Sequence, residues 1–221
     1  MLRTKNNSKL SLDLYNTMRF KIFLFVFIAP ILFAQSGNEI LKKVQAKFNS
    51  ITSFSAGFSQ SIFGPDGKPA GKENGTFVYK RKNKFIVDQK RGMIISDSES
   101  VWNYDKKNKK VVISTFFDEP TSFSIERFIF DYPSQCRVKF VKEESSDLEK
   151  VILLTPRDEQ LDLKEIKIWI NNSDMVVKLQ IVDLIDMKYI FSFSDIKENP
   201  EVSDLKFNFT PPKGTKIIDL R

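Results

Sequence analysis

The sequence predicts a mainly β protein in which ten or eleven short antiparallel strands form one curling sheet. Apolar and polar residues alternate with period two, for example from Phe54 to Ser59, as they do in strands that bury one face. Turn-forming pairs such as Asp66-Gly67 and Asn171-Asn172 separate these runs, because such residues adopt the backbone angles that tight turns need. Many short strands joined by tight turns favour an antiparallel sheet that curves.

The first 34 residues predict a leader rather than part of the folded domain. Met18 begins a short basic stretch that is followed by an apolar run over residues 22–33 and by the small residue Ala34, which is the layout of a secretory signal peptide. About a dozen apolar residues are too few to cross a bilayer, which needs about 20, so a retained anchor is the less favoured alternative. We expect residues 1–34 to be a leader, with its true start at Met18, and residues 35–221 to be the mature domain.

The composition argues against most enzyme classes. The chain has no His, which removes the usual general base and the His-containing catalytic triads. Cys136 is the single cysteine, so neither an internal disulfide nor a thiolate metal cluster can form. We expect no metal or cofactor, although an enzyme could still draw carboxylates from distant segments. The leader carries +4 of the net charge of +7, and the remaining +3 gives no reason to expect a nucleic-acid partner.

One helix is expected to open the mature domain, with Asn38 as its N-cap and residues 35–37 as a mobile start. Its apolar residues recur at helical spacing on one face: Ile40, Leu41, Val44 and Phe48. After this helix, the period-two pattern recurs in short runs. These runs lie at 54–59, 76–79, 85–87, 93–96, 101–104, 111–113, 138–140, 151–154, 165–170, 177–181, 191–194 and 207–209.

Residues 119–132 break the alternation and predict a short helix. Phe123, Ile125 and Phe128 lie in a stretch that is apolar nearly all round. A helix of this kind must be covered on several sides. We therefore expect it to act as a lid or plug at the mouth of the curled sheet.

The aromatic content predicts a cavity beneath this lid. The chain has 21 Phe, 5 Tyr and 2 Trp. Any single Phe is most simply a core residue, but many rigid aromatic side chains on a concave sheet could hold open a space for an apolar guest. The alternative is a structural protein whose interior is filled by its own side chains. The apolar residues that we expect in the cavity or lid are Phe58, Phe77, Phe85, Phe123, Ile125, Phe128, Phe191 and Phe193.

The mature domain resembles the LolA family of outer-membrane lipoprotein carrier proteins. The resemblance rests on five blocks in the family's order, namely ILKKVQAKFNSITSFSAGFSQ, GTFVYKRKNKFIVD, IISDSESVWNYD, VILLTP and FNFTPPKGTKIID. The last block is the most specific, with the spacing F-x-F-x-P-P-x-G-x-x-x-x-D. The resemblance implies an unclosed β-barrel with a helical lid, whose hydrophobic cavity takes lipoprotein acyl chains in the periplasm. It also places Trp102 near that cavity.

The resemblance further implies a site residue and partners. In the family, a basic residue after the G-x-aromatic strand, usually an Arg before a Pro, latches the lid by binding backbone carbonyls of the lid helices. That position is Arg81 here, and Lys82 replaces the Pro. A planar guanidinium suits the role, whereas surface charge alone would make Arg81 a solvated turn residue. The implied partners are triacylated lipoproteins, an inner-membrane lipoprotein-releasing ABC transporter and, often in the family, an outer-membrane receptor.

Other functions stay open from the sequence. The chain could be a periplasmic binding protein for another lipid or glycolipid, a lipid-sensing envelope-stress module, or an enzyme that acts on envelope lipids. We expect a monomer, because cargo exchange through a shared mouth leaves little room for a permanent partner.

Overall fold

The computed structural model describes residues 36–116, 125–158 and 161–221, which all belong to the unit Gln35–Arg221. The predicted signal peptide and its cleavage site lie outside the described residues, as does Phe123. Within the described residues, no helix is long and apolar enough to cross a bilayer.

Helix α1 (Gly37–Ser50) opens the described domain. Its N-cap is Ser36, whose hydroxyl accepts a hydrogen bond from the backbone N–H of Glu39 at 3.2 Å, while the Glu39 carboxylate accepts one from the Ser36 N–H at 2.9 Å. This reciprocal capping box stabilises the start of the helix, so the expected N-cap at Asn38 is wrong. Of the expected mobile start at 35–37, residue 35 lies outside the described residues, Ser36 is the N-cap and Gly37 is the first helical residue. The predicted apolar face is confirmed, because it is buried: Ile40, Leu41, Val44 and Phe48.

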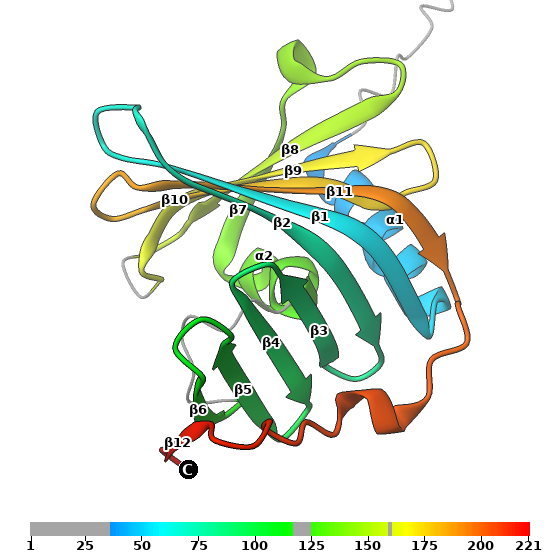
Figure 1. Ribbon diagram of the computed structural model, residues 1–221. Coiled ribbons are helices and arrows are strands. Elements are labelled where there is room, and N and C mark those ends of the chain that lie inside the picture. Colours follow the sequence, from blue (N-terminus) through cyan, green and yellow to red (C-terminus); the bar gives the residue numbers. More distant parts are fainter. Residues whose placement is uncertain (1–35, 117–124, 159–160) are drawn as a thin grey trace, which may run out of the picture. The chain divides into compact units, whose positions relative to one another are not determined.

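Twelve strands form one sheet in the described part of the chain (Figure 1). The order is β12-β6-β5-β4-β3-β2-β1-β11-β10-β9-β8-β7, and the two outermost strands, β12 and β7, do not pair with each other. The predicted unclosed, mainly antiparallel sheet is therefore confirmed, with twelve strands where ten or eleven were expected. The strands are β1 (Ser53–Phe63), β2 (Pro69–Lys80), β3 (Lys84–Gln89), β4 (Gly92–Asp97), β5 (Ser100–Asp105), β6 (Lys110–Thr115), β7 (Cys136–Phe140), β8 (Glu149–Pro156), β9 (Leu163–Asn171), β10 (Val176–Asp183), β11 (Lys188–Glu198) and β12 (Lys216–Asp219).

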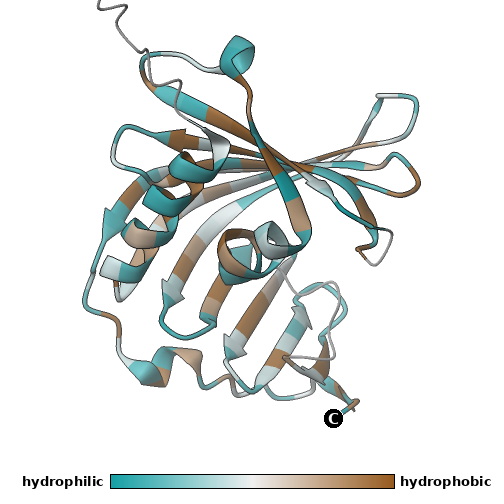
Figure 2. Ribbon diagram, turned by 180° about the vertical axis from the view of Figure 1, so that it is seen from behind, coloured by the Kyte–Doolittle hydropathy of each residue, from teal (hydrophilic) through white to brown (hydrophobic). Residues whose placement is uncertain are grey.

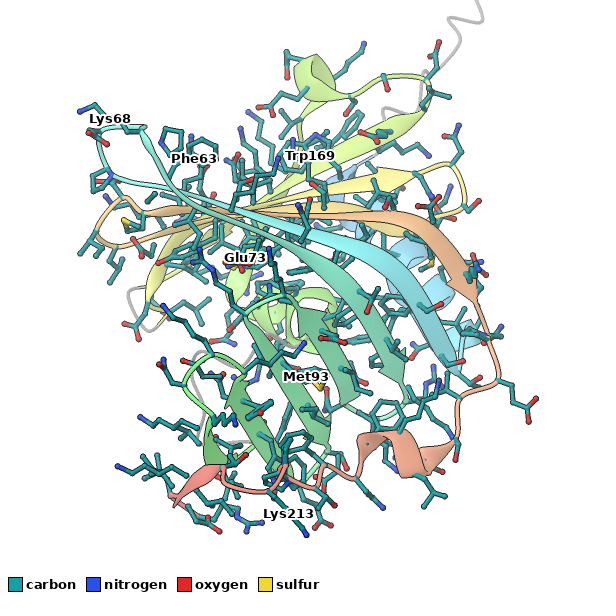
Figure 3. The ribbon with its side chains drawn as sticks, in the orientation of Figure 1. Phe63, Lys68, Glu73, Met93, Trp169 and Lys213 are labelled. Atoms are coloured by element: carbon teal, nitrogen blue, oxygen red, sulfur yellow. The ribbon has the colours of Figure 1, made fainter. Side chains whose placement is uncertain are left out.

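Apolar and polar residues alternate along the strands, as Figure 2 shows, so the sheet has two different faces. On β9, Ile166, Ile168 and Ile170 belong to the main buried cluster. Trp169 points to the other face of the sheet, where the Lys178 ammonium lies 4.1 Å from the centre of its ring (Figure 3). This is the pattern that a period-two sequence predicts for a strand with one buried face.

The C-terminal part of the sheet differs from the expectation. Every predicted run except 207–209 falls within a strand, whereas Phe207 ends the short 3-10 helix η3 (Asp204–Phe207). The Ser203 hydroxyl caps this helix at the Leu205 N–H, and such local side-chain bonds compete with strand pairing. The last strand is β12, which pairs with β6 in parallel.

The predicted helix near residue 125 is present in its described part. Residues 125–135 are helical and comprise the π-helical turn η1 (Arg127–Asp131) and the short helix α2 (Tyr132–Gln135). We call residues 125–135 the helical segment. Figures 1 and 2 show it on the same side of the sheet as α1, and η1 contacts α1. Another 3-10 turn, η2 (Lys142–Glu144), joins β7 to β8.

Candidate functional site

The interior of the sheet is lined by an aromatic cluster at its centre, where β1 pairs with β2 and β11 (Figure 1). The ring of Phe58 lies 6.0 Å from that of Phe191 and 6.1 Å from that of Phe193. Phe77 lies 5.6 Å from Phe193 and 6.4 Å from Phe85. The structure therefore brings these five predicted residues into one buried cluster.

The helical segment adds its apolar side chains to this cluster. Ile125 and Phe128 are 4% and 6% exposed and belong to the same buried cluster as the sheet residues. The ring of Phe128 lies 5.2 Å from that of Tyr132, nearly edge to face. The segment is thus held against the interior of the sheet by its apolar side chains.

Trp102 does not join the other predicted residues, which corrects the expectation that it stands near the cavity. Its neighbour Val101 belongs to the main cluster. Adjacent residues on a strand point to opposite faces, so Trp102 lies on the other side of the sheet. There it packs against a smaller buried cluster that contains Tyr104, Val111 and Ile113.

Apolar side chains of α1, β1 and the helical segment pack against one another beneath the segment. The space between Phe48, Phe54, Ile125 and Ile129 has a volume of about 10 Å³, which is about the minimum for one water molecule. An acyl chain can therefore occupy this space only when the helical segment moves away.

A larger cleft of about 440 Å³ lies beside the helical segment, between the end of α1 and the β2–β3 turn. Its lining is mixed. Aromatic rings line it from α1 and from the helical segment, and charged side chains line it as well. The charged lining residues are Arg81, Lys82, Glu126, Arg127 and Asp131. The cleft can take a ligand that is partly polar.

Arg81 binds the C-terminal end of α1. Its Nη2 donates hydrogen bonds to the backbone carbonyls of Phe48, at 3.1 Å, and Asn49, at 2.5 Å. The last carbonyls of a helix lack partners within the helix, and a cation there also interacts favourably with the helix dipole. Arg81 thus binds carbonyls of α1, and neither of these two hydrogen bonds goes to the helical segment. The peptide bond between Arg81 and Lys82 is cis. The role of Arg81 as a latch stays a prediction.

Glu126 connects the helical segment to the sheet and was not singled out from the sequence. Its carboxylate accepts hydrogen bonds from the Tyr79 hydroxyl and from the backbone N–H of Asn83, the latter at 3.0 Å. Burial, together with the bond to Glu126, raises the pKa of Tyr79 above its ordinary value, so this hydroxyl remains a donor throughout the physiological range. One signal was available in the sequence, because Glu126 is a carboxylate inside an otherwise apolar stretch.

One further bond joins the two helical elements to each other. The Gln45 side-chain amide on α1 donates to the backbone carbonyl of Ile129 at 2.9 Å.

The guanidinium of Arg127 lies 5.7 Å from the centre of the Phe116 ring, in the range of a cation–π contact. Among the residues that the structure describes, no group of three or more acidic or Cys side chains is placed to hold a metal ion.

The geometry defines a class of protein: an unclosed β-sheet with an apolar interior that a tethered helical segment closes. Residues 49–210 match the family described as "Outer membrane lipoprotein carrier protein LolA". The chain belongs to this family.

Individual relatives agree with this assignment. The chain is 24% identical over 201 residues to an outer-membrane lipoprotein carrier protein of Histophilus somni strain 2336, covering 90% of this chain and 94% of the relative. It is 24% identical over 186 residues to the protein of the same description from Serratia proteamaculans strain 568, covering 83% and 89% of the two chains. A solved structure of an uncharacterised conserved protein from Thermus thermophilus shares the fold, with a TM-score of 0.51 at 12% identity, covering 82% and 98% of the two chains.

Proposed function

We propose that this protein is a periplasmic carrier that binds the acyl chains of lipoproteins released from the inner membrane and delivers them to the outer membrane. The observation that carries the proposal is the match to the LolA family over residues 49–210. Two relatives that align along most of their length are described as outer-membrane lipoprotein carriers. The proposal assigns no catalysis to the chain.

The physical need for such a carrier follows from the chemistry of the cargo. Each methylene that is exposed to water costs about 0.8 kcal/mol. A long acyl chain therefore costs on the order of 10 kcal/mol in water, and free diffusion between two membranes is negligible. The aromatic cluster around Phe58, Phe77 and Phe193 supplies the apolar surface that could replace water around such a chain.

Loading requires the protein to change its conformation. Because the space between Phe48, Phe54, Ile125 and Ile129 has a free volume of only about 10 Å³, a guest that binds there competes with the segment for the same place. A ligand that binds only the open form shifts the population toward that form, and its apparent affinity depends on how often the open form occurs. The closed form therefore favours release, which a carrier needs as much as binding.

The proposed partners follow from the same role. An inner-membrane ABC transporter would supply the triacylated lipoprotein, and the outer membrane or a receptor in it would accept the cargo. The protein would act as a monomer after export and removal of residues 1–34.

The proposal is tested by isolating the full chain from the envelope of its native host and identifying what copurifies by native mass spectrometry. We expect an acylated lipoprotein in a one-to-one complex. A two-vesicle assay then measures transfer of a fluorescent triacylated lipopeptide from donor to acceptor vesicles, with and without the protein. Acceleration of transfer supports the proposal. A stoichiometric glycolipid or other lipid in place of lipopeptide, or no acceleration, overturns it.

A further inference from the structure

We propose that Glu126 is a positioning residue that holds the helical segment closed over the interior, and that it forms a second latch, separate from Arg81. This inference rests on the proposed function, because the position of the segment matters only if a guest binds beneath it.

The geometry of Glu126 places one carboxylate between three elements. The residue lies in the helical segment, directly after the buried Ile125. Its Oε1 accepts one hydrogen bond from the Tyr79 hydroxyl at the end of β2 and one from the Asn83 N–H in the β2–β3 turn. Asn83 has a φ of 53°, a left-handed conformation that asparagine tolerates better than most residues. The turn and the strand thus hold two donors toward the same oxygen.

The surroundings of Tyr79 make this contact costly to break without a replacement. Tyr79 is 1% exposed, and its ring lies 5.0 Å from that of Phe48 and 5.3 Å from that of Phe54. These rings fix the position of the phenol oxygen beside Glu126. A conformation that leaves a buried donor without an acceptor is destabilised by the full desolvation free energy of that donor. A hydrocarbon guest that displaces the segment offers no acceptor in return.

The hydrogen bonds of Glu126 and those between Arg81 and α1 involve different elements, although both side chains act on Tyr79, where burial and Glu126 raise the pKa of the hydroxyl and Arg81 lowers it. Arg81 donates to the carbonyls of Phe48 and Asn49 on α1, whereas Glu126 belongs to the helical segment. Both sets of contacts end on the short stretch 79–83, which comprises the end of β2 and the turn that follows. Each of the two helical elements on this side of the sheet therefore has its own polar connection to the same stretch.

The charges near Glu126 do not replace its two donors. Arg81, Lys82, Arg127 and Asp131 line the same cleft. The first three attract the Glu126 carboxylate through their charge and Asp131 repels it, and neither effect depends on a particular donor direction. The directional bonds from Tyr79 and Asn83 distinguish the closed position of the segment from any other position near this cluster of charges.

The decisive variants are Glu126→Leu and the matched control Glu126→Gln. Leu removes the acceptor at similar size, while Gln keeps a carbonyl oxygen that can accept both hydrogen bonds and loses only the charge. The first measurement is hydrogen exchange, followed by mass spectrometry, on the full ligand-free mature protein. With E126L we expect exchange in residues 125–135 to accelerate about tenfold or more, with strands β8 and β9 unchanged. E126Q is expected to restore much of the protection.

The second measurement is the affinity for a fluorescent fatty-acid probe. Because the probe binds only the open form, E126L should tighten the apparent affinity by about tenfold. A substitution that merely loosened the fold would weaken binding instead. Unchanged exchange in 125–135 for E126L, or equal exchange in E126L and E126Q, overturns the proposal. Failure of the proposed function is seen separately, as absence of probe binding to the parent protein.

A double-mutant cycle keeps the test decisive if E126L does not fold. Tyr79→Phe keeps the buried ring and removes one donor. We expect Y79F to accelerate exchange in 125–135, and the combination of Y79F with Glu126→Ala to be less than additive, because both changes remove the same hydrogen bond. Strict additivity overturns the assignment.

Discussion

Replacing Arg81 by leucine should leave the protein folded but slow the release of cargo. The variant loses two hydrogen bonds to the carbonyls of Phe48 and Asn49. Hydrogen bonds to a charged group contribute about 1.5–3 kcal/mol each where they are buried. Arg81 is half-buried and Asn49 is exposed, so solvent screening lowers the total to about 1–2 kcal/mol.

This loss is small relative to what still holds α1 in place. The buried side chains of Ile40, Val44 and Phe48 anchor the helix on the sheet side, and each contributes about 1.5–3 kcal/mol by its burial. For a domain of this size, 1 kcal/mol changes the melting temperature by about 2–4 °C. We therefore expect Arg81→Leu to melt about 2–8 °C lower than the parent protein, measured by circular dichroism.

The effect on cargo has the opposite sign to the effect on stability. Under the latch prediction the open form lacks the bonds between Arg81 and α1, so losing about 1–2 kcal/mol from the closed, empty form alone makes the open form about 5- to 30-fold more accessible. Loading should be retained or improved, and transfer of a triacylated lipopeptide to acceptor vesicles should slow by a similar factor. Lys82→Leu is the matched control, because it removes a neighbouring exposed cation that makes neither of the bonds to α1. Parent-like transfer by the Arg81 variant would refute the reasoning.

Three further changes test other parts of the structure. Phe128→Asp places a carboxylate where the native ring is buried, so amide exchange across residues 125–135 should rise; parent-like exchange in the folded variant would contradict the packing. The pKa of Tyr79 is raised in the folded state, so its contribution to stability is complete below the ordinary value of about 10 and is lost as the pH rises beyond it. Urea midpoints at about pH 9 and 11 should therefore fall less in Tyr79→Phe than in the parent protein. Ser36→Ala should cost about 1 kcal/mol by removing the N-cap, whereas Asn38→Ala should leave the melting temperature nearly unchanged, and the reverse result would restore Asn38 as the cap.

Periodicity was sufficient to predict the features that depend on local pattern. The apolar face of α1 and every strand run from 54–59 to 191–194 could be read from spacing alone, because burial of one face imposes a fixed period. The predicted N-cap, Asn38, lies two residues after the observed one, Ser36. The sequence pattern did not separate them, because Ser and Asn both cap helices well. Only the reciprocal bond with Glu39 distinguishes them.

Features that depend on long-range contacts could not be predicted in this way. The pairing of β12 with β6 joins segments about 100 residues apart, and no local pattern encodes it. Trp102 lies one position from Val101 of the main cluster, and a shift of one residue moves a side chain to the other face. Glu126 became recognisable as part of the site only when the fold placed Tyr79 and Asn83 beside it.

The division between apolar and polar contacts explains how one site could both hold and release an acyl chain. Apolar packing alone cannot favour the empty form strongly, because an acyl chain offers about the same gain per buried methylene as the side chains that it displaces. The polar contacts behave differently, since a hydrocarbon chain has no acceptor for Arg81 and no donor for Glu126. If Arg81 and Glu126 act as the two predicted latches, those contacts exist only when α1 and the helical segment are in place and add to the stability of the empty form alone. The aromatic interior would therefore set how much lipid the protein can shelter, and the two latches would set how readily it gives that lipid up.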